Sequence, residues 1–425
     1  MSTLPIPQTI SLTITTECGS RCPHCYLVET GEIGRHRLAL ADVEHVVEDA
    51  ARNGVHMIIV SGGDPLRHPD IEPILRKIRS LRMLPLLGIS GDYLPAEHIE
   101  LIAILGIPCV QVSLDAASAP LHDARRGTGS FHAVMENVVR LQSVGILVNI
   151  ATCLSMETYT ELAPLLHLAK KIGIHKIKVA FYETIGLIPG ATTIPETTRK
   201  KLLLLTKRFA DTNEWTNRVA VPGYDLQSGK RLSAADRGRL PIVVAADGTL
   251  RSGEDGPQFG HLSEINAPSY QYRRWLREQI SIHLDTLISL HSTHLRVRKV
   301  LDVKEGLRCN GVVFAEGDQH TILIRNGLDW PLNRFTVLHE LGHIATGTLR
   351  TNAQRHYRAD DETSANLWAL ECLRPVIRTN EFPYYVRDAN ASEHALYTRI
   401  AHRLVGDLIP PTASETRPCT ALAIR

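Results

Sequence analysis

Six short apolar runs, separated by amphipathic stretches, limit the folds open to this sequence more than any other feature. The candidate strands are TISLTIT (9–15), VHMIIVSG (55–62), LPLLGIS (84–90), CVQVSLD (109–115), LVNIATC (147–153) and HKIKVAF (175–181). Helix-like segments lie between them at 39–53, 69–80, 95–105, 131–144 and 157–172. Strands that alternate with helices favour a parallel sheet with right-handed crossovers, either open or curled into a barrel. Because most runs are almost continuously apolar, we expect these strands to be covered on both faces.

The alternation weakens after about residue 190, and other patterns follow. They predict a hairpin with an Asp-Gly turn at 240–250, a linking helix at 270–300, a strand pair at 312–327, a helix carrying RFTVLHELGHIATG, and another helix from near Asp361. A chain of 425 residues is too long for one ordinary core. We therefore expect two domains, with a boundary near 265–275.

Composition and charge exclude several classes of protein. Apolar residues make up 44% and charged residues 22% of the chain, as in soluble globular proteins. A net charge of +2 argues against strong non-specific binding to nucleic acid or anionic lipid. No apolar run approaches the roughly 20 residues that span a bilayer, and MSTLPIPQTI lacks the features of a secretory signal. We therefore expect a cytoplasmic protein, in which cysteines are more often ligands or nucleophiles than disulfide partners.

The stretch CGSRCPHC (18–25) places three thiols in one short loop after the first predicted strand. Three thiolates can bind three irons of a [4Fe–4S] cube and leave the fourth iron without a protein ligand. The alternatives are a zinc knot or three free thiols. Zinc usually takes four ligands in pairs, and His24 lies between two thiols instead of at a finger spacing.

The CxxxCxxC pattern after a first strand resembles the radical S-adenosylmethionine (radical SAM) superfamily. The resemblance implies one [4Fe–4S] cluster on Cys18, Cys22 and Cys25, with SAM bound to the open iron. It also implies an external electron donor such as flavodoxin or ferredoxin, and cleavage of SAM to a 5′-deoxyadenosyl radical that abstracts a hydrogen atom. The resemblance covers roughly residues 8–190 and predicts a partial (β/α)6 barrel within an α/β fold.

Further segments extend this resemblance to the SAM site. SGGDP (61–65) is similar to the family's GGEP segment, with Asp64 in place of the usual glutamate. VSLDAAS (112–118) and HDARRGTGSF (122–131) resemble the family's fourth-strand pattern and its continuation. His24 stands where the family commonly has an aromatic residue near the adenine. The SAM-binding residues implied are Gly62, Gly63, Asp64, Ser113, Asp115, Arg126 and His24. Each of these residues also has a purely structural interpretation.

Residues 191–269 are expected to complete the barrel and to include a remnant of the SPASM or twitch extension of peptide-modifying members. The segment 243–264, VVAADGTLRSGEDGPQFGHLSE, resembles the frame of that extension. No cysteine occurs between 153 and 309, so the sequence predicts a single cluster.

A second motif, HELGH, occupies residues 339–343. On a helix, His339 and His343 lie one turn apart on the same face, where both imidazoles can meet one metal ion. Glu340 points sideways from that pair and can accept a proton from metal-bound water. Zinc in such a site lowers the pKa of bound water toward about 7. The alternative is a helix with surface histidines and no metal.

The segments RFTVLHELGH and DETSANLWALECLRP (361–375) resemble the ImmA/IrrE-type metallopeptidases, which implies a smaller α+β, zincin-like domain at 301–425 after a linker helix at 270–300. In that family a glutamate on the next helix supplies the third zinc ligand, a place that Glu362 fits. The rival ligands are Asp360, Asp361, Glu371 and His356. Iron held by the same residues for oxygen chemistry is a further alternative, but it suits an oxygen-labile cluster poorly.

Three functions are consistent with these patterns. The first is a bifunctional enzyme that modifies a ribosomally made peptide by radical chemistry and hydrolyses a peptide bond with zinc. The second is a radical SAM enzyme acting on a small molecule, with a regulatory C-terminal domain that cleaves a repressor. The third has a non-catalytic peptide-binding module at the C-terminus. None of them requires nucleic acid or a membrane.

Overall fold

A computed structural model describes residues 7–182, 193–231, 241–253, 256–264, 267–303, 310–328, 330–349 and 359–373. The chain divides into two compact units, with the boundary between Tyr272 and Arg273. Each unit is described here by itself. No helix in the described ranges combines the length and apolar character needed to cross a bilayer.

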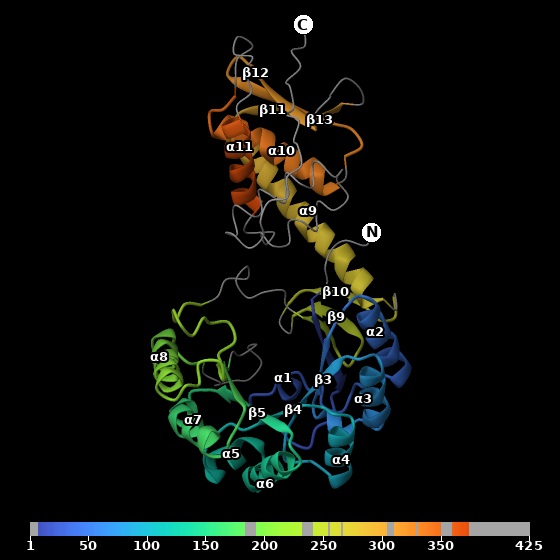
Figure 1. Cartoon of the computed structure of the whole chain (residues 1–425), viewed down its shortest axis with the longest axis vertical. Helices are drawn as coiled ribbons and strands as arrows, with labels where there is room; N and C mark the ends of the chain where they lie inside the picture. The colour runs from blue at the N-terminus through green and yellow to red at the C-terminus, as the bar shows by residue number, and fades with distance from the viewer. Residues whose placement is uncertain are drawn as a thin grey trace. The chain divides into compact units, whose positions relative to one another are not determined.

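The first unit is built on a ten-stranded sheet in the order β10-β9-β8-β1-β2-β3-β4-β5-β6-β7 (Figure 1). Its central strands are parallel and follow the chain order: β1 (Thr9–Thr15), β2 (Met57–Gly62), β3 (Leu84–Ile89), β4 (Cys109–Ser113), β5 (Leu147–Leu154) and β6 (Lys176–Phe181). These strands confirm the six predicted from the apolar runs. The fold is a mixed α/β fold with a large parallel sheet, consistent with a radical SAM barrel.

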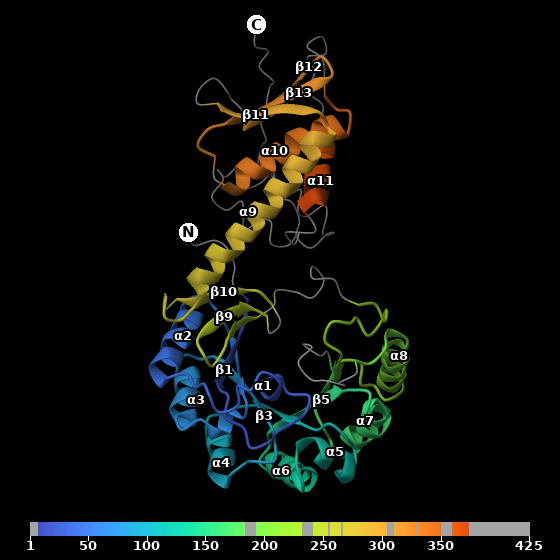
Figure 2. The same ribbon diagram turned by 180° about the vertical axis from the view of Figure 1, so that it is seen from behind.

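Helices connect the parallel strands and lie along the outer side of the curved sheet (Figures 1 and 2). They are α2 (Leu40–Arg52), α3 (Ile71–Ser80), α4 (Ala96–Ile104), α5 (Ala119–Arg126), α6 (Ser130–Ser143), α7 (Leu162–Lys171) and α8 (Glu196–Thr212). Short elements complete this part of the chain: α1 (Tyr26–Glu29), η1 (Pro65–Arg67), η2 (Tyr159–Glu161) and β7 (Val219–Ala220).

The inner face of the sheet differs from expectation. On β5, Val148, Ile150 and Leu154 are fully buried, whereas Asn149 and Cys153, on the opposite face, are only half-buried. Side chains alternate across a strand, so helices cover the first set while the second faces the inside of the arc. The prediction that both faces are fully covered was therefore wrong for β5, whose inner face remains accessible.

An antiparallel extension follows α8 in the sequence and joins the sheet beside β1. It consists of β8 (Ile242–Val244), β9 (Thr249–Ser252) and β10 (Gln258–His261). The predicted Asp-Gly turn joins β8 to β9: Gly248 has φ 91°, and the Asp247 carboxylate accepts a 2.9 Å hydrogen bond from the Thr249 amide. A positive φ at this place favours glycine.

The second unit holds most of α9 (Pro268–His294), a three-stranded sheet and two further helices. The sheet has the order β11-β13-β12 and is formed by β11 (Val297–Val303), β12 (Gly311–Glu316) and β13 (Gln319–Arg325). The helices are α10 (Trp330–Ala345) and α11 (Ala359–Leu373), which pack against each other, and α10 also packs on β12 and β13.

The predicted linker helix 270–300 was wrong at its C-terminal end. The helix ends at His294, Arg296 takes a left-handed backbone conformation with φ 56°, and residues 297–303 pair in parallel with β13. The valines and leucine of VRKVLDV suit a strand, and the pairing available from β13 is not visible in a helical pattern.

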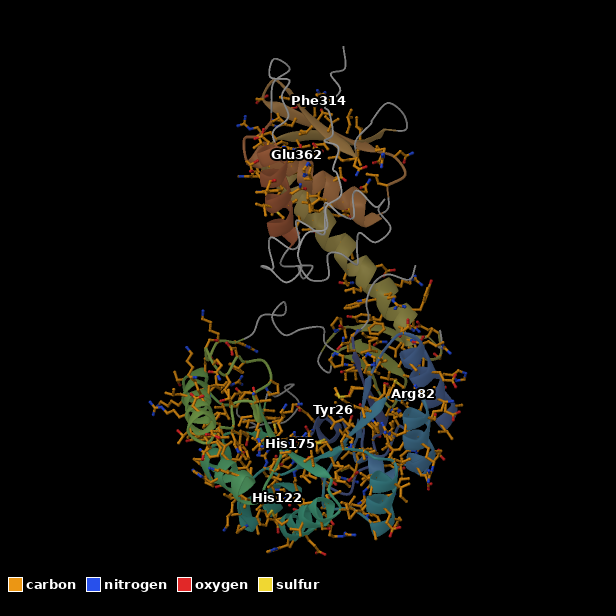
Figure 3. All side chains as sticks on the ribbon, viewed as in Figure 1. Tyr26, Arg82, His122, His175, Phe314 and Glu362 are labelled. Carbon is orange, nitrogen blue, oxygen red and sulfur yellow. The ribbon has the colours of Figure 1, made fainter. Side chains whose placement is uncertain are left out.

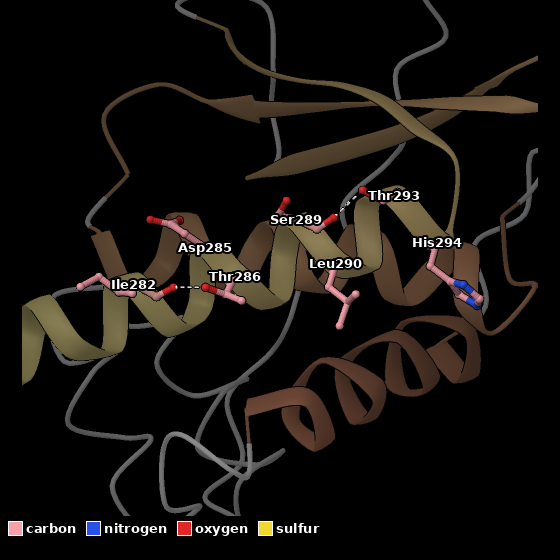
Figure 4. A pocket seen from close by; sticks show the side chains of 7 residues that line it. All are labelled: Ile282, Asp285, Thr286, Ser289, Leu290, Thr293 and His294. Atoms are coloured by element: carbon pink, nitrogen blue, oxygen red, sulfur yellow. Dashed lines mark hydrogen bonds between the residues drawn. The ribbon is translucent and has the colours of Figure 1, made fainter.

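One face of α9 lines an open hollow of about 870 Å³, shown in Figure 4. Ile282 and Leu290 expose apolar side chains there. Asp285 on the same face lies 2.9 Å from Arg334 in α10, and this ion pair ties α9 to the helix that carries HELGH.

Candidate functional sites

The three clustered cysteines lie in the loop between β1 and α1. The Cys25 amide donates a 3.0 Å hydrogen bond to the Cys22 carbonyl, which turns the chain between the second and third cysteines. None of the three cysteines forms a disulfide, and the charge of Cys25 contributes to raising the pKa of both Cys18 and Cys22. Burial raises the pKa of Cys18, and it raises that of Cys22 to about 11 although the charge of Arg126 opposes it. Three thiols in one loop, two of them with pKa values raised by burial, fit the donor set of an iron–sulfur cluster, which would stabilise them as thiolates.

Two glycines, the last residue of β2 and the residue after it, hold this loop close to the sheet. The Gly63 amide donates to the Thr15 carbonyl at 2.8 Å, and the Asp64 amide donates to the Glu17 carbonyl at 2.7 Å. A Cβ on Gly63 would lie 2.3 Å from the Glu17 carbonyl oxygen, and one on Gly62 would lie 2.4 Å from that of Thr15. Both neighbours are backbone atoms that cannot move away cheaply, so this approach requires glycine at both positions.

Asp64 uses its carboxylate within the protein. One oxygen caps η1 by accepting a 3.1 Å hydrogen bond from the Leu66 amide, and the other accepts a hydrogen bond from the Ser90 hydroxyl. The side chain is completely buried. The sequence analysis did not identify Ser90, although its place at the end of the third predicted strand was a usable signal. The expected contact between Asp64 and SAM stays a prediction.

Asp115 is the centre of a buried charge cluster at the end of β4. Its Oδ2 accepts a 2.6 Å hydrogen bond from Nε of Arg126, and its Oδ1 accepts one of 3.1 Å from the Cys153 amide. Burial raises the pKa of Asp115, but the charge of Arg126 outweighs it and lowers that pKa to about 2. The terminal nitrogens of Arg126 make no hydrogen bond to any residue in the described ranges. Arg126 therefore has donors available for a ligand.

His24 packs against this cluster. Its Nε2 lies 3.4 Å from Oδ2 of Asp115, and burial lowers the pKa of His24 to about 4. The ring is therefore neutral at pH 7, and the contact with Asp115 is not an ion pair. Ser113, two residues before Asp115 at the end of β4, donates a hydrogen bond from its hydroxyl to the Ile89 carbonyl at 3.3 Å. Figure 3 labels Tyr26, which follows Cys25, and His122, which accepts a hydrogen bond from the Asp115 amide.

The second candidate site is formed by α10 and α11. Nε2 of His339 and Nε2 of His343 lie 3.1 Å apart, and the Glu362 carboxylate lies 3.0 Å from the first and 3.2 Å from the second. Glu362 is labelled in Figure 3. In the described part of the chain, these residues form the one group of three side chains whose ligand atoms all lie within 4.8 Å of one another. Two histidines and one carboxylate in this arrangement match the donor set of zinc.

Charge within this group favours a bound cation. Burial lowers the pKa of His339, but the hydrogen bond that His339 donates to Glu362 and the charges of Glu340 and Glu362 raise it to about 8. Burial raises the pKa of Glu362, whereas both histidines lower it to about 2. The two Nε2 atoms, 3.1 Å apart, can share a proton in a hydrogen bond or bind one cation together with Glu362.

Gly342 of HELGH lets the two helices approach. A Cβ on Gly342 would lie 2.6 Å from the carbonyl oxygen of Ala365, which is fully buried in α11. Ala365 follows Glu362 by one helical turn, so the contact at Gly342 sets the distance between the third ligand and the two histidines. This second role of the motif's glycine was not part of the sequence analysis.

Glu340 is buried and lies beside the edge strand β12. Its carboxylate accepts a hydrogen bond from the Val313 amide, and burial raises its pKa above the usual value. A Cβ on Gly311 would lie 3.0 Å from Oε1 of Glu340. Among the rival ligands, Asp361 is described and lies outside the group of three. His356 and the side chains of Asp360 and Glu371 lie outside the described residues.

Comparisons with known proteins match the part of the chain that contains the cysteine loop. Residues 12–169 match the family model of the radical SAM superfamily. Over 181 residues the chain is 28% identical to the AdoMet-dependent heme synthase of Methanosarcina barkeri, covering 42% of this chain and 52% of that protein. Over 185 residues it is 24% identical to the PqqA peptide cyclase of Rhodopseudomonas palustris, covering 43% and 49%. The chain thus spans about half the length of these curated relatives.

The fold of the first unit also matches a solved structure. SuiB of Streptococcus suis, bound to the precursor peptide SuiA, superposes with a TM-score of 0.54 and 16% sequence identity, over 63% of this chain and 65% of that one. At this identity the match concerns the fold alone. Together with the family match, the cysteine loop and the parallel sheet, it leads to one conclusion: residues 12–169 of this chain form a radical SAM domain.

Proposed function

We propose that this chain is a peptide-maturation enzyme with two metal centres. The radical SAM domain would modify a peptide, and the His339–His343–Glu362 group would bind zinc and hydrolyse a peptide bond in the same substrate. The observation that carries the proposal is the presence on one chain of two separate ligand sets, three thiols in one loop and two imidazoles with a carboxylate. Joining two activities in one chain raises the effective concentration of a shared substrate.

At the first site, Cys18, Cys22 and Cys25 would hold the [4Fe–4S] cluster. When bound, the cluster and SAM supply a carbon radical that removes a hydrogen atom from the substrate, after an external carrier such as flavodoxin or ferredoxin delivers an electron. Arg126 supports this assignment, because its Nε is fixed on Asp115 while its terminal nitrogens remain available for a carboxylate such as that of SAM. Gly62 and Gly63 keep the loop against the sheet without a side chain in the way.

At the second site, His339, His343 and Glu362 would hold a zinc ion, which would polarise the scissile carbonyl and lower the pKa of bound water. Glu340 would take the proton from that water and pass it to the leaving amine. Burial raises its pKa, which brings the carboxylate closer to neutral pH and makes it a better acceptor and donor of protons. The Val313 amide would hold this carboxylate beside β12.

Two of the relatives favour a peptide substrate, although they do not identify the peptide. The PqqA peptide cyclase is named for a peptide, and SuiB has been solved with its precursor peptide. A peptide substrate would also suit a hydrolytic site. We place the enzyme in the cytoplasm, a reducing compartment that suits three free thiols.

The test uses the purified full chain, reconstituted anaerobically with iron, sulfide and zinc, and the precursor peptides encoded next to it. Wild type with SAM and reductant should modify the peptide and cut it. His339→Ala should modify without cutting, and Cys22→Ala should form no 5′-deoxyadenosine. A peptide that is modified but left uncut by wild type and His339→Ala alike would reject the shared substrate.

A second candidate is a radical SAM enzyme for a small molecule, with a C-terminal unit that cleaves a repressor in response to a signal. The similarity to the heme synthase of Methanosarcina barkeri favours it. A porphyrin or other small molecule that raises 5′-deoxyadenosine formation, when no precursor peptide does, would support this alternative over the first.

A further inference from the structure

The outer nitrogens of the two HELGH histidines have specific partners. Nδ1 of His339 lies 2.8 Å from Oδ1 of Asn366, and Nδ1 of His343 lies 2.9 Å from Oγ1 of Thr348. Both contacts point away from the centre of the site, where the two Nε2 atoms and Glu362 converge. Neither partner belongs to the ligand set of the proposed function. What they control is the position of the ring proton.

Asn366 fixes the proton of His339. An amide oxygen can only accept, so the 2.8 Å contact requires a hydrogen on Nδ1, and Nε2 is the nitrogen left to bind a metal. Asn366 is 4% exposed and lies one helical turn after Glu362 on α11. One face of α11 therefore supplies both the third ligand and the group that orients the first.

Thr348 fixes the proton of His343 by a chain of hydroxyl groups. Thr346 donates its only proton to the Gly342 carbonyl at 2.7 Å. The 3.0 Å contact between Thr346 and Thr348 therefore needs the proton of Thr348. With its proton used there, or on the His343 carbonyl 3.4 Å away, the Thr348 oxygen accepts from Nδ1 of His343, and Nε2 is again the nitrogen left to bind a metal.

The end of α10 explains how Thr348 reaches a ring five residues earlier. The helix ends at Ala345, and Gly347 turns the chain back with φ 68°. The Thr348 amide then donates to the His343 carbonyl at 3.0 Å, which closes the helix and places the side chain beside the ring. A left-handed glycine at this place is the usual way to end a helix.

We infer that Asn366 and Thr348 are positioning residues that hold both imidazoles with the proton on Nδ1, so that both Nε2 lone pairs face the metal. The inference rests on the metal site of the proposed function. Partners of this kind on metal-bound histidines typically change metal affinity by 10–100-fold when they are removed.

The first experiment measures zinc affinity of the metal-free full chain by competition with a chromophoric chelator. The zinc retained by His339→Ala is subtracted, because the thiols can also bind zinc. Thr348→Val keeps the shape of the side chain and removes the acceptor, so affinity should fall by 10–100-fold, whereas Thr348→Ser should stay within about threefold of wild type. Thr286→Val is the matched control, because its hydroxyl bonds only the Ile282 carbonyl of its own helix, and it should change nothing.

The same titration with Asn366 gives an independent arm. Asn366→Leu should weaken zinc binding by 10–100-fold, and Asn366→Asp, which keeps an acceptor, should restore it. Circular dichroism of the metal-free variants identifies any that fail to fold. If Asn366→Leu fails to fold, Thr348→Val, at a half-buried position, still decides the question.

Two results would overturn the inference while leaving the metal site intact. One is wild-type affinity in both Thr348→Val and Asn366→Leu. The other is a loss of zinc affinity in Thr348→Ser and Asn366→Asp as large as that in Thr348→Val and Asn366→Leu. It would mean that side-chain shape matters and the hydrogen bond does not. If wild type binds no more zinc than His339→Ala, the metal site itself is wrong and this inference falls with it.

Discussion

Replacing Gly63 with alanine should loosen the cysteine loop. The new Cβ would lie 2.3 Å from the carbonyl oxygen of Glu17, 2.7 Å from its carbonyl carbon and 2.9 Å from Cβ of Cys18. Relief requires the loop to move away from β2, because two of these three atoms are backbone. Crowding of this kind costs about 1–3 kcal/mol. A value of about 2 kcal/mol would shift the equilibrium between closed and open loop by about 30-fold.

Gly88→Ala is the matched control for this experiment. Gly88 lies in β3 on the same sheet, and a Cβ there would meet its nearest atoms at 3.9 and 4.0 Å, which is ordinary contact. Hydrogen–deuterium exchange of the peptide covering the loop should be about 30-fold faster in Gly63→Ala than in wild type and unchanged in Gly88→Ala. Iron content after anaerobic reconstitution should fall in the first variant only. Equal exchange and equal iron in both variants would refute the argument that the glycine is required by close packing.

Three further predictions concern the second site and the buried charges. Gly342→Ala should separate α10 from Ala365 and weaken zinc binding at least tenfold in chelator competition, and unchanged affinity would show that the third ligand does not depend on this contact. Asp115→Asn leaves Arg126 buried without its counter-charge and should lower the free energy of unfolding in urea by about 3–5 kcal/mol, whereas a loss below about 1 kcal/mol would mean that the pair is not buried in solution. Burial and the charge of Arg126 lower the pKa of His122 to about 4. Between pH 6.5 and 4, His122 therefore takes up a proton in the unfolded chain but not in the folded one. Stability should therefore fall by up to about 3 kcal/mol as the pH drops through that window, and His122→Asn should flatten the dependence, which a urea midpoint measured against pH would reveal.

The sequence was sufficient for the parallel strands because each is a local apolar run between helical segments. Spacing alone also singled out the three cysteines, which lie in one loop, and the two histidines, which one turn of helix places with their Nε2 atoms 3.1 Å apart. The helix expected up to residue 300 was wrong beyond His294, because the pairing of β11 with β13 joins segments about twenty residues apart. Local periodicity does not report such a pairing.

Roles that depend on distant partners could not be predicted in the same way. Asp64 bonds Ser90, and His24 packs on Asp115, in each case across a gap that only the folded sheet closes. Asn366 and Thr348 could have been suspected only after the rings of the two histidines were placed. A sequence motif identifies the metal ligands, whereas the groups that orient those ligands depend on the packing of the whole unit.

The most direct test of two independent metal centres is elemental analysis of the reconstituted full chain and of two variants. Wild type should hold about four irons and one zinc per chain. Cys22→Ala should lose iron and keep zinc, and His339→Ala should lose zinc and keep iron together with its ability to release 5′-deoxyadenosine from SAM. Iron that is unchanged in Cys22→Ala, or zinc that is unchanged in His339→Ala, would contradict the account.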